Sequence, residues 1–233
     1  MTTELVVVER AAFADSAARR LAAEIRRALE TRECCSLALS GGSTPRPVYQ
    51  RLAAELPDRE TWTRIDVFFG DERCVPPADP ASNYRMAREA LLDLVPVGRS
   101  QVHRMEGERS DHSEAARAYA ALLPERLDLL VLGLGRDGHI VSLFPGSSSL
   151  AESHHRVIAV SAPAPPRDRL TITPPVIREA RLTIGLVAGS EKADALARAI
   201  DGPYAPDLTP GQLARGGLWI ADTAAASRLE ARR

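Results

Sequence analysis

Residues 128–146 read DLLVLGLGRDGHIVSLFPG, and this stretch decides the fold class. Its first part is a short apolar run that ends at Gly133, which is typical of a strand buried on both faces. The glycines Gly133, Gly135 and Gly138 then spell G-x-G-x-x-G, which indicates a sharp turn where that strand ends. The stretch therefore predicts a buried strand whose end presents the polar side chains of RDGH.

The same glycine pattern occurs in dinucleotide-binding turns. A site of that kind needs an acidic residue about 20 positions later to bind the ribose. The next apolar run, VIAV at 157–160, ends in SAPAPP and offers no carboxylate. A lone G-x-G-x-x-G is weak support, so the sequence disfavours nucleotide binding at this turn.

Short apolar runs alternate with helical patterns along the rest of the chain, beginning with a helix predicted over 11–30. Strands are expected at 36–39, 65–69, 127–133, 157–160, 182–188 and 218–221, and further helices at 47–56, 82–94, 113–123, 190–200 and 222–231. The proline-rich segment 162–169 is expected to be a surface loop. This alternation predicts a single α/β domain over residues 1–233, Rossmann-like, with a mostly parallel sheet flanked by helices on both faces.

Charge and composition exclude several classes of protein. The 30 basic and 31 acidic residues are interleaved, so no basic face for nucleic acid is expected. The segment MTTELVVVER resembles neither a signal peptide nor a membrane anchor, so we expect a cytoplasmic protein with no membrane partner. Cys34, Cys35 and Cys74 form no C-x-x-C pair, which argues against a disulfide framework or a thiolate zinc site.

Two residues stand out because each is the only one of its type. Lys192 is the only lysine among the basic residues, and Asn83 is the only asparagine. Each is either a relic of drift or a position that needs this particular side chain. Lys192 lies at the start of a predicted helix, where a cation opposes the helix dipole unless a bound anion compensates it. A Schiff-base lysine is the alternative function.

Four polar loops follow four of the predicted strands. They are SGGSTP at 40–45, GDER at 70–73, GLGRDGH at 133–139 and GSEK at 189–192. Ligands bind outside the carboxyl ends of the strands in parallel α/β sheets. We therefore expect all four loops to lie on one rim.

The SGGSTP loop has the composition of an anion-binding cradle. Gly41 and Gly42 let backbone amides approach a ligand, Ser43 and Thr44 are candidate helix caps, and Pro45 suits a first helical position. Free amides at a helix start favour a phosphate. An ordinary glycine turn with a helix cap is the alternative. The loop lacks the lysine of a P-loop, which disfavours a nucleoside triphosphate.

Two loops carry candidate catalytic groups. Arg73 of GDER either pairs with the acidic side chains beside it or stabilises an oxyanion. His139 is a candidate general base if it is not simply structural. With Asp137 it supplies at most two metal ligands, so no metal site is expected. The absence of G-x-S-x-G disfavours a serine nucleophile.

In order along the chain, SGGSTP, GDERCVPPADPASNYRMAREALL and LDLLVLGLGRDGHIVSLFPG resemble the glucosamine-6-phosphate isomerase/6-phosphogluconolactonase family. The resemblance continues into RLTITPPVIREA and LVAGSEKADAL, and it implies the fold of glucosamine-6-phosphate deaminase. Two features favour the lactonase branch. Arg73 follows the D-E pair where deaminases tend to have tyrosine, and SLFPG follows DGH where they tend to have F-N-E-P.

The resemblance implies hydrolysis of 6-phospho-D-glucono-1,5-lactone to 6-phosphogluconate in the oxidative pentose phosphate pathway, without a cofactor. His139 would act as general base and Arg73 would stabilise the oxyanion. Asp71 and Asp137 would orient the imidazole, the guanidinium or the sugar hydroxyls. Asn83 would hold the DER loop or touch the substrate.

The same resemblance implies that the substrate phosphate binds at one end of the site. The residues implied are Gly41, Gly42, Ser43, Thr44, Arg169 and Lys192. The expected partner is a small phosphosugar lactone, bound by a monomer or small homo-oligomer.

The chain departs from the family pattern in two places. Ile140 and Val141 stand where lactonases more often have smaller or hydroxylated residues, and segment 204–219 fits the usual pattern poorly. Two alternatives stay open: an isomerase or deaminase acting on an amino-sugar phosphate, and a non-catalytic sugar-phosphate-binding protein.

Overall fold

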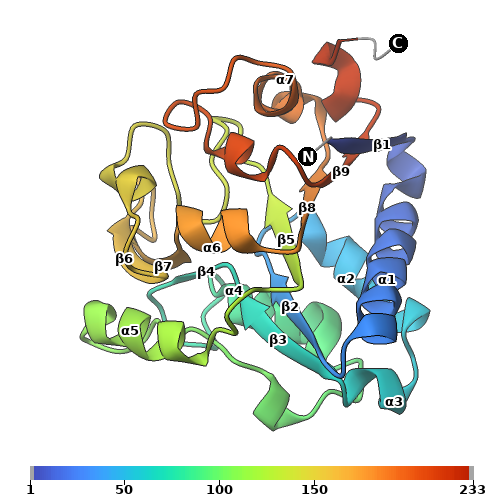
Figure 1. Ribbon diagram of the computed structural model, residues 1–233, viewed down its shortest axis with the longest axis vertical. Helices are drawn as coiled ribbons and strands as arrows, with labels where there is room; N and C mark the ends of the chain where they lie inside the picture. The colour runs from blue at the N-terminus through green and yellow to red at the C-terminus, as the bar shows by residue number, and fades with distance from the viewer. Residues whose placement is uncertain (1–2, 231–233) are drawn as a thin grey trace.

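A six-stranded parallel sheet forms the centre of the computed structural model, which describes residues 3–230 (Figure 1). The strand order is β1-β9-β8-β5-β2-β3, and every adjacent pair is parallel. The strands are β1 (Glu4–Val8), β2 (Cys35–Leu39), β3 (Ile65–Phe69), β5 (Leu129–Gly133), β8 (Leu182–Val187) and β9 (Leu218–Asp222). The α/β fold with a mostly parallel sheet, as predicted, is confirmed.

Both faces of this sheet are buried, which explains why its strands read as unbroken apolar runs. Successive side chains of a strand point to opposite faces. Leu37 and Leu39 of β2 therefore join one apolar core, whereas Ala38 between them joins the other. In β3, Phe69 and Phe68 divide between the two cores in the same way.

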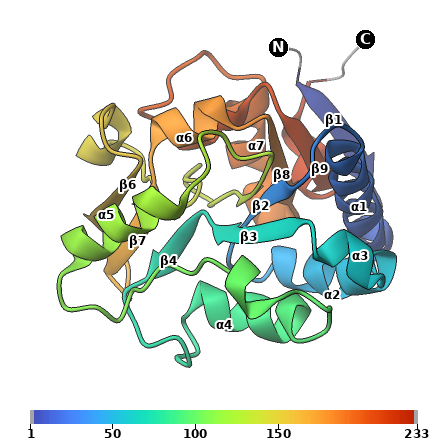
Figure 2. The ribbon, with the colours of Figure 1, turned by 60° about the horizontal axis from the view of Figure 1, so that its bottom comes forward.

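Helices cover both faces of the sheet (Figures 1 and 2). One core packs against α1 (Phe13–Thr31), α2 (Pro45–Glu55), α3 (Arg59–Trp62), α4 (Asn83–Ala87) and the π-helical turn Arg88–Leu92. The other packs against α5 (His112–Leu122), α6 (Pro174–Glu179) and α7 (Ala193–Ile200). Short 3-10 turns span Arg10–Ala12, Arg99–Gln101, Ser148–Ala151, Ser190–Lys192, Pro210–Ala214 and Ala225–Arg228.

A second, antiparallel sheet in the order β4-β7-β6 lies beside the main one. It consists of β4 (Asp71–Arg73), β7 (Asp168–Ile172) and β6 (Val157–Ser161). The strand expected at 157–160 belongs to this sheet, where its outer residues are partly exposed. GDER is a short strand rather than a loop, and the proline-rich segment becomes strand at Asp168. Because these strands are only three to five residues long, the sequence does not indicate that β4, β7 and β6 pair with one another.

Several element boundaries differ from the predictions. The helix expected over 82–94 divides into α4 and the π-helical turn, and the one over 190–200 begins as a 3-10 turn. The helix expected over 222–231 is wrong, because Asp222 ends β9 and only a 3-10 turn follows; residue 231 lies outside the described residues. The strand β1 and the short helix α6 were not predicted.

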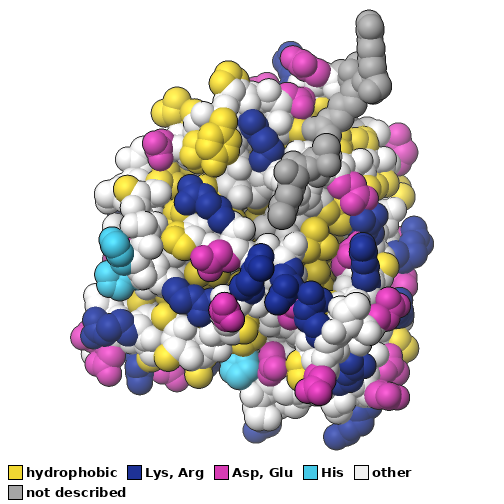
Figure 3. All heavy atoms as spheres, in the orientation of Figure 1, with side chains coloured by type: hydrophobic (Ala, Val, Ile, Leu, Met, Phe, Trp, Pro, Cys, Tyr) yellow, Lys and Arg dark blue, Asp and Glu magenta, His cyan; other side chains and the backbone are white. Residues whose placement is uncertain are grey.

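Basic and acidic side chains lie next to one another on the face shown in Figure 3. This agrees with the interleaved charges of the sequence. Among residues 3–230, no helix is both long enough and apolar enough to cross a membrane.

Candidate active site

The structure brings the four polar loops together around a cleft of about 380 Å³ at the carboxyl end of the main sheet. In parallel α/β sheets this edge is the usual place for a ligand. The lining comes from residues 40–45, Asp71, Arg73, residues 133–136, His139, Glu191 and Lys192, with Arg169 from β7. Every residue proposed from the sequence except Asp137 lines this cleft, and Asp137 contacts the cleft residue His139.

The glycine turn after β5 is shaped around His139. The amide of Gly135 donates to the carbonyl of His139 at 2.8 Å, and Gly138 has a φ of +94°, which favours glycine. A Cβ on Gly135 would lie 2.0 Å from His139 Nδ1, so only glycine fits. No helix starts at this turn, and the next helical element is the 3-10 turn Ser148–Ala151. The turn therefore lacks the helix N-terminus that a dinucleotide site requires.

Asp137 fixes the orientation of the His139 ring. Its Oδ1 lies 2.6 Å from His139 Nδ1, and this hydrogen bond lowers the pKa of Asp137 to about 2. Because an ionised carboxylate only accepts, Nδ1 carries a proton and Nε2 is left for a substrate. The ring also packs against Phe144, with centroids 4.8 Å apart. Within residues 3–230, no group of three or more His, Cys, Asp or Glu side chains is placed to hold a metal ion.

Asp71 is held by different partners from those of Asp137. Its side chain is buried, and it accepts hydrogen bonds from Asn83 Nδ2 at 3.0 Å and from Ser142 Oγ at 2.6 Å. Asn83 also donates to the backbone carbonyl of Asp71 at 2.9 Å. Of the two roles expected for Asn83, these contacts match the one that holds the DER segment.

Val141, one of the two residues that depart from the family pattern after DGH, has an unusual backbone. Its φ of 46° lies in the left-handed region, which is rare for a β-branched residue. Ser142, which follows it, donates its amide to Thr171 Oγ1 at 3.2 Å and its hydroxyl to Asp71. Strained residues of this kind concentrate where function constrains the chain.

Glu72 has a structural role next to these groups. It accepts the amides of Arg73, Asn83 and Tyr84 at 2.7, 2.7 and 2.8 Å. Burial raises its pKa despite these hydrogen bonds, which act in the opposite direction. The guanidinium of Arg73 instead donates to the carbonyl of Ala81, and its buried Nε has no hydrogen-bond partner within residues 3–230. The alternative in which Arg73 is neutralised by its acidic neighbours therefore does not match the contacts.

At the other side of the cleft, α2 presents a helix N-terminus. Pro45 occupies its first turn as expected, but the Thr44 side chain makes no capping hydrogen bond. The preceding Gly42 has a φ of +103°. Pro45 and Pro47 have no N–H, so the amides at this helix start come from Arg46 and the preceding loop 41–44, and the helix dipole favours an anion beside them.

Several cations converge on the cleft. Arg169 lies opposite Arg73 in the β4–β7 register, and burial followed by repulsion from Arg73 lowers its pKa. Burial also lowers the pKa of Lys192, the residue before α7, and no ion pair holds its ammonium within residues 3–230. Like charges brought together in this way are stabilised by a bound anion.

Sequence reasoning missed two further cations that line the cleft, Arg136 and Arg10. Arg136 stands inside GLGRDGH, so the loop that located His139 carried a signal for it. Arg10 precedes the first helix in an ordinary stretch, and nothing in the local sequence marks it.

The fold and the cleft together define a parallel α/β protein that offers an imidazole and several cations to an anionic ligand. The chain belongs to the glucosamine-6-phosphate isomerases/6-phosphogluconolactonase family, whose model matches residues 8–219.

Individual relatives agree with this membership. A Streptomyces coelicolor protein named 6-phosphogluconolactonase is 39% identical, with 98% of this chain and 95% of the relative covered. The crystal structure of a Thermotoga maritima 6-phosphogluconolactonase superposes with a TM-score of 0.85 at 25% identity, covering 95% of this chain and all of that one. A monomeric glucosamine-6-phosphate deaminase shares the fold, with a TM-score of 0.83 at 23% identity, covering 98% of this chain and all of that one.

Proposed function

We propose that this protein hydrolyses 6-phospho-D-glucono-1,5-lactone to 6-phosphogluconate, a step of the oxidative pentose phosphate pathway. The observation that carries the proposal is the Asp137–His139 pair at 2.6 Å on the rim of a cationic cleft. A general base held in one tautomer suits water activation, and the surrounding cations suit a phosphorylated substrate.

In this mechanism, Nε2 of His139 takes a proton from water as the water oxygen attacks the lactone carbonyl carbon. The carbonyl oxygen becomes negatively charged, and the guanidinium of Arg73 stabilises it. The C1–O5 bond then breaks, and the proton on Nε2 passes to O5. The product is the open-chain acid, and no covalent bond to the protein forms.

The substrate phosphate binds where the uncapped amides of residues 41–44 meet Lys192 and Arg169. Binding energy at this remote group positions the carbonyl carbon beside His139. Asp137 orients the imidazole. Asp71, held by Asn83 and Ser142, offsets the positive charge of Arg169 and accepts a sugar hydroxyl.

The test is acid release from freshly generated 6-phosphogluconolactone, measured against the spontaneous rate. We expect the wild type to accelerate ring opening strongly and His139→Ala to lose about 100-fold or more of that acceleration. His154→Ala is the matched control, because His154 is exposed and lies outside the cleft.

A wild type no faster than buffer would remove the lactonase proposal. In that case, release of ammonia from glucosamine 6-phosphate would point to the deaminase alternative. Phosphosugar binding without turnover of either substrate would point to the binding-protein alternative.

Three wider predictions accompany this proposal: a single domain over residues 1–233, a cytoplasmic location, and a monomer or small homo-oligomer. They stay predictions.

A further inference from the structure

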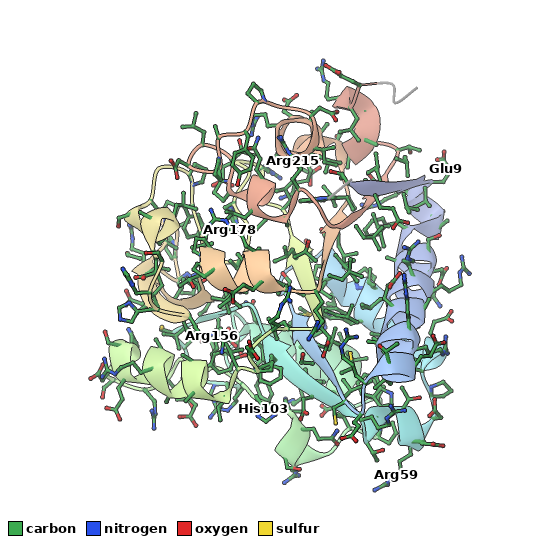
Figure 4. All side chains as sticks on the ribbon, viewed as in Figure 1. Glu9, Arg59, His103, Arg156, Arg178 and Arg215 are labelled. Carbon is green, nitrogen blue, oxygen red and sulfur yellow. The ribbon has the colours of Figure 1, made fainter. Side chains whose placement is uncertain are left out.

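Arg10 reaches the cleft from outside the four polar loops. It follows the end of β1, marked by Glu9 in Figure 4, and its side chain lines the same cleft as Gly42 and Lys192. Most of the Arg10 side chain is exposed, with a relative accessibility of 68%. An exposed arginine usually adopts many conformations, so what holds this one in place decides whether it contributes to a site.

Asp222, at the end of β9, holds Arg10. The Asp222 carboxylate is fully buried and accepts from Arg10 Nη1 at 2.9 Å. It also accepts the amide of Gly189 at 3.1 and 3.0 Å and the amide of Ala225 at 2.7 Å. Burial alone would raise the pKa of Asp222, but the hydrogen bonds from these amides and from Arg10 outweigh it and lower the pKa. The Asp222 carboxylate is therefore ionised, and both of its oxygens accept hydrogen bonds.

The same carboxylate also positions the loop that carries Lys192. Gly189 has a φ of +103°, and its carbonyl accepts the amide of Lys192 at 3.0 Å. The Asp222 carboxylate thus binds both the backbone amide of Gly189 and the guanidinium of Arg10. Two cations that are far apart in the sequence, Arg10 and Lys192, are thereby held beside the same cleft.

Arg10 has unused hydrogen-bonding capacity in this arrangement. A guanidinium has five N–H donors, and within residues 3–230 only Nη1 of Arg10 has a hydrogen-bond partner, Asp222. The fork of an arginine matches two oxygens of a phosphate. The cleft lining also has an excess of positive charge: Arg10, Arg73, Arg136, Arg169 and Lys192 against the acids Asp71 and Glu191.

We propose that Arg10 binds the phosphate group of the substrate through the free donors of its guanidinium, and that Asp222 is the positioning residue for both Arg10 and the Lys192 loop. This inference rests on the phosphosugar site proposed above, and it adds a phosphate contact from outside the four loops.

The test is calorimetric binding of 6-phosphogluconate, with gluconate as the ligand that lacks the phosphate. We expect Arg10→Gln to weaken 6-phosphogluconate binding by about tenfold, the size expected for one charged hydrogen bond. Arg10→Lys should keep part of the affinity. Arg19→Gln is the matched control, because Arg19 is an exposed arginine on α1 that does not line the cleft.

Kinetics provide a second readout. With the phosphorylated lactone, Arg10→Gln should lower kcat/KM about tenfold, because a contact with the phosphate is lost. With glucono-1,5-lactone, which has no phosphate, the variant should match the wild type. Equal 6-phosphogluconate affinity in Arg10→Gln and Arg19→Gln would overturn the proposal, as would an equal loss with both lactones.

These results separate this inference from the lactonase proposal. If the wild type binds 6-phosphogluconate but does not accelerate lactone opening, a weaker Arg10→Gln still supports the phosphate contact. A wild type that does not bind 6-phosphogluconate overturns it. Asp222→Asn should weaken binding at least as much as Arg10→Gln, and little further loss should appear when the two changes are combined. Should Asp222→Asn not fold, the Arg10 variants decide.

Discussion

The hydroxyl of Ser142 donates to Oδ2 of Asp71 at 2.6 Å, across a sequence separation of 71 residues. Both side chains are buried, and the turn that brings Ser142 there has Val141 in the left-handed region. A short hydrogen bond to a buried carboxylate holds that carboxylate in one orientation. The unusual residue Val141 thus lies directly before a contact that orients a candidate active-site group.

Replacing Ser142 with alanine should lower kcat/KM for the lactone by about tenfold or more, because Asp71 loses a hydrogen bond to a charged group. Ser149→Ala is the matched control, since Ser149 is also buried but its hydroxyl contacts Ser147 rather than Asp71. Steady-state rates measured at one pH, with thermal melting to confirm folding, make the comparison. An unchanged kcat/KM in a folded Ser142→Ala protein would show that Asp71 does not depend on this contact.

The glycine turn allows a sharper comparison between two of its own glycines. Gly135→Ala should reduce kcat strongly, because its Cβ would lie 2.0 Å from His139 Nδ1 and 2.5 Å from Asp137 Oδ1. Gly133→Ala should have a smaller effect, since a Cβ there meets only Ser40 Oγ at 3.6 Å. Rates of the two variants should be compared at equal folded fraction. Similar losses in both would contradict a turn built around the histidine.

Asp137 should make stability depend on pH in a defined range. Its folded pKa of about 2 lies below the usual 3.8, so the carboxylate stabilises the fold at neutral pH and loses that effect as pH falls from about 4 toward 2. Because the side chain is 46% exposed, solvent screening limits the contribution to about 1 kcal/mol or less. Melting temperatures of wild type and Asp137→Asn should therefore differ at pH 7 and converge as the pH falls toward 2. A constant difference across that range would rule out this linkage.

The three cysteines should react with iodoacetamide at different rates. Cys34 is exposed, whereas burial raises the pKa of Cys35 to about 12 and that of Cys74 to about 11. Since the thiolate is the reactive form, we expect Cys34 to be labelled first at pH 8 in the native protein. Peptide mass spectrometry gives the order, and unfolding in denaturant should equalise the rates. Early labelling of Cys35 would contradict its burial in β2.

The sequence was most informative where one local rule determined the structure. Unbroken apolar runs such as 127–133 predicted a parallel sheet, because both faces of such a strand are buried. The rule that ligands bind at the carboxyl ends of strands then placed four separate loops around one cleft. The polar residues of these loops could therefore be predicted as cleft residues from the sequence alone.

Features that depend on distant partners were not predicted. The strand at 157–160 was predicted, but not its place in a second, antiparallel sheet, because its pairing with Asp168–Ile172 is not encoded locally. The helix expected over 222–231 has a favourable composition, but Asp222 is needed to bind Gly189 and Arg10. The sequence likewise did not show that Asp71 contacts Ser142 whereas Asp137 contacts His139.

The parallel pairing of β1 with β9 joins nearly the first described residues to nearly the last, with Glu4 opposite Leu218 and Val8 opposite Asp222. On the ribosome, β1 is made long before β9, its partner in the main sheet of residues 3–230. Contacts so far apart in sequence form slowly, because closing a long loop costs entropy. The sheet edge that carries Arg10 therefore depends on the longest-range pairing of the main sheet, and a nascent chain that lacks β9 leaves β1 without this partner.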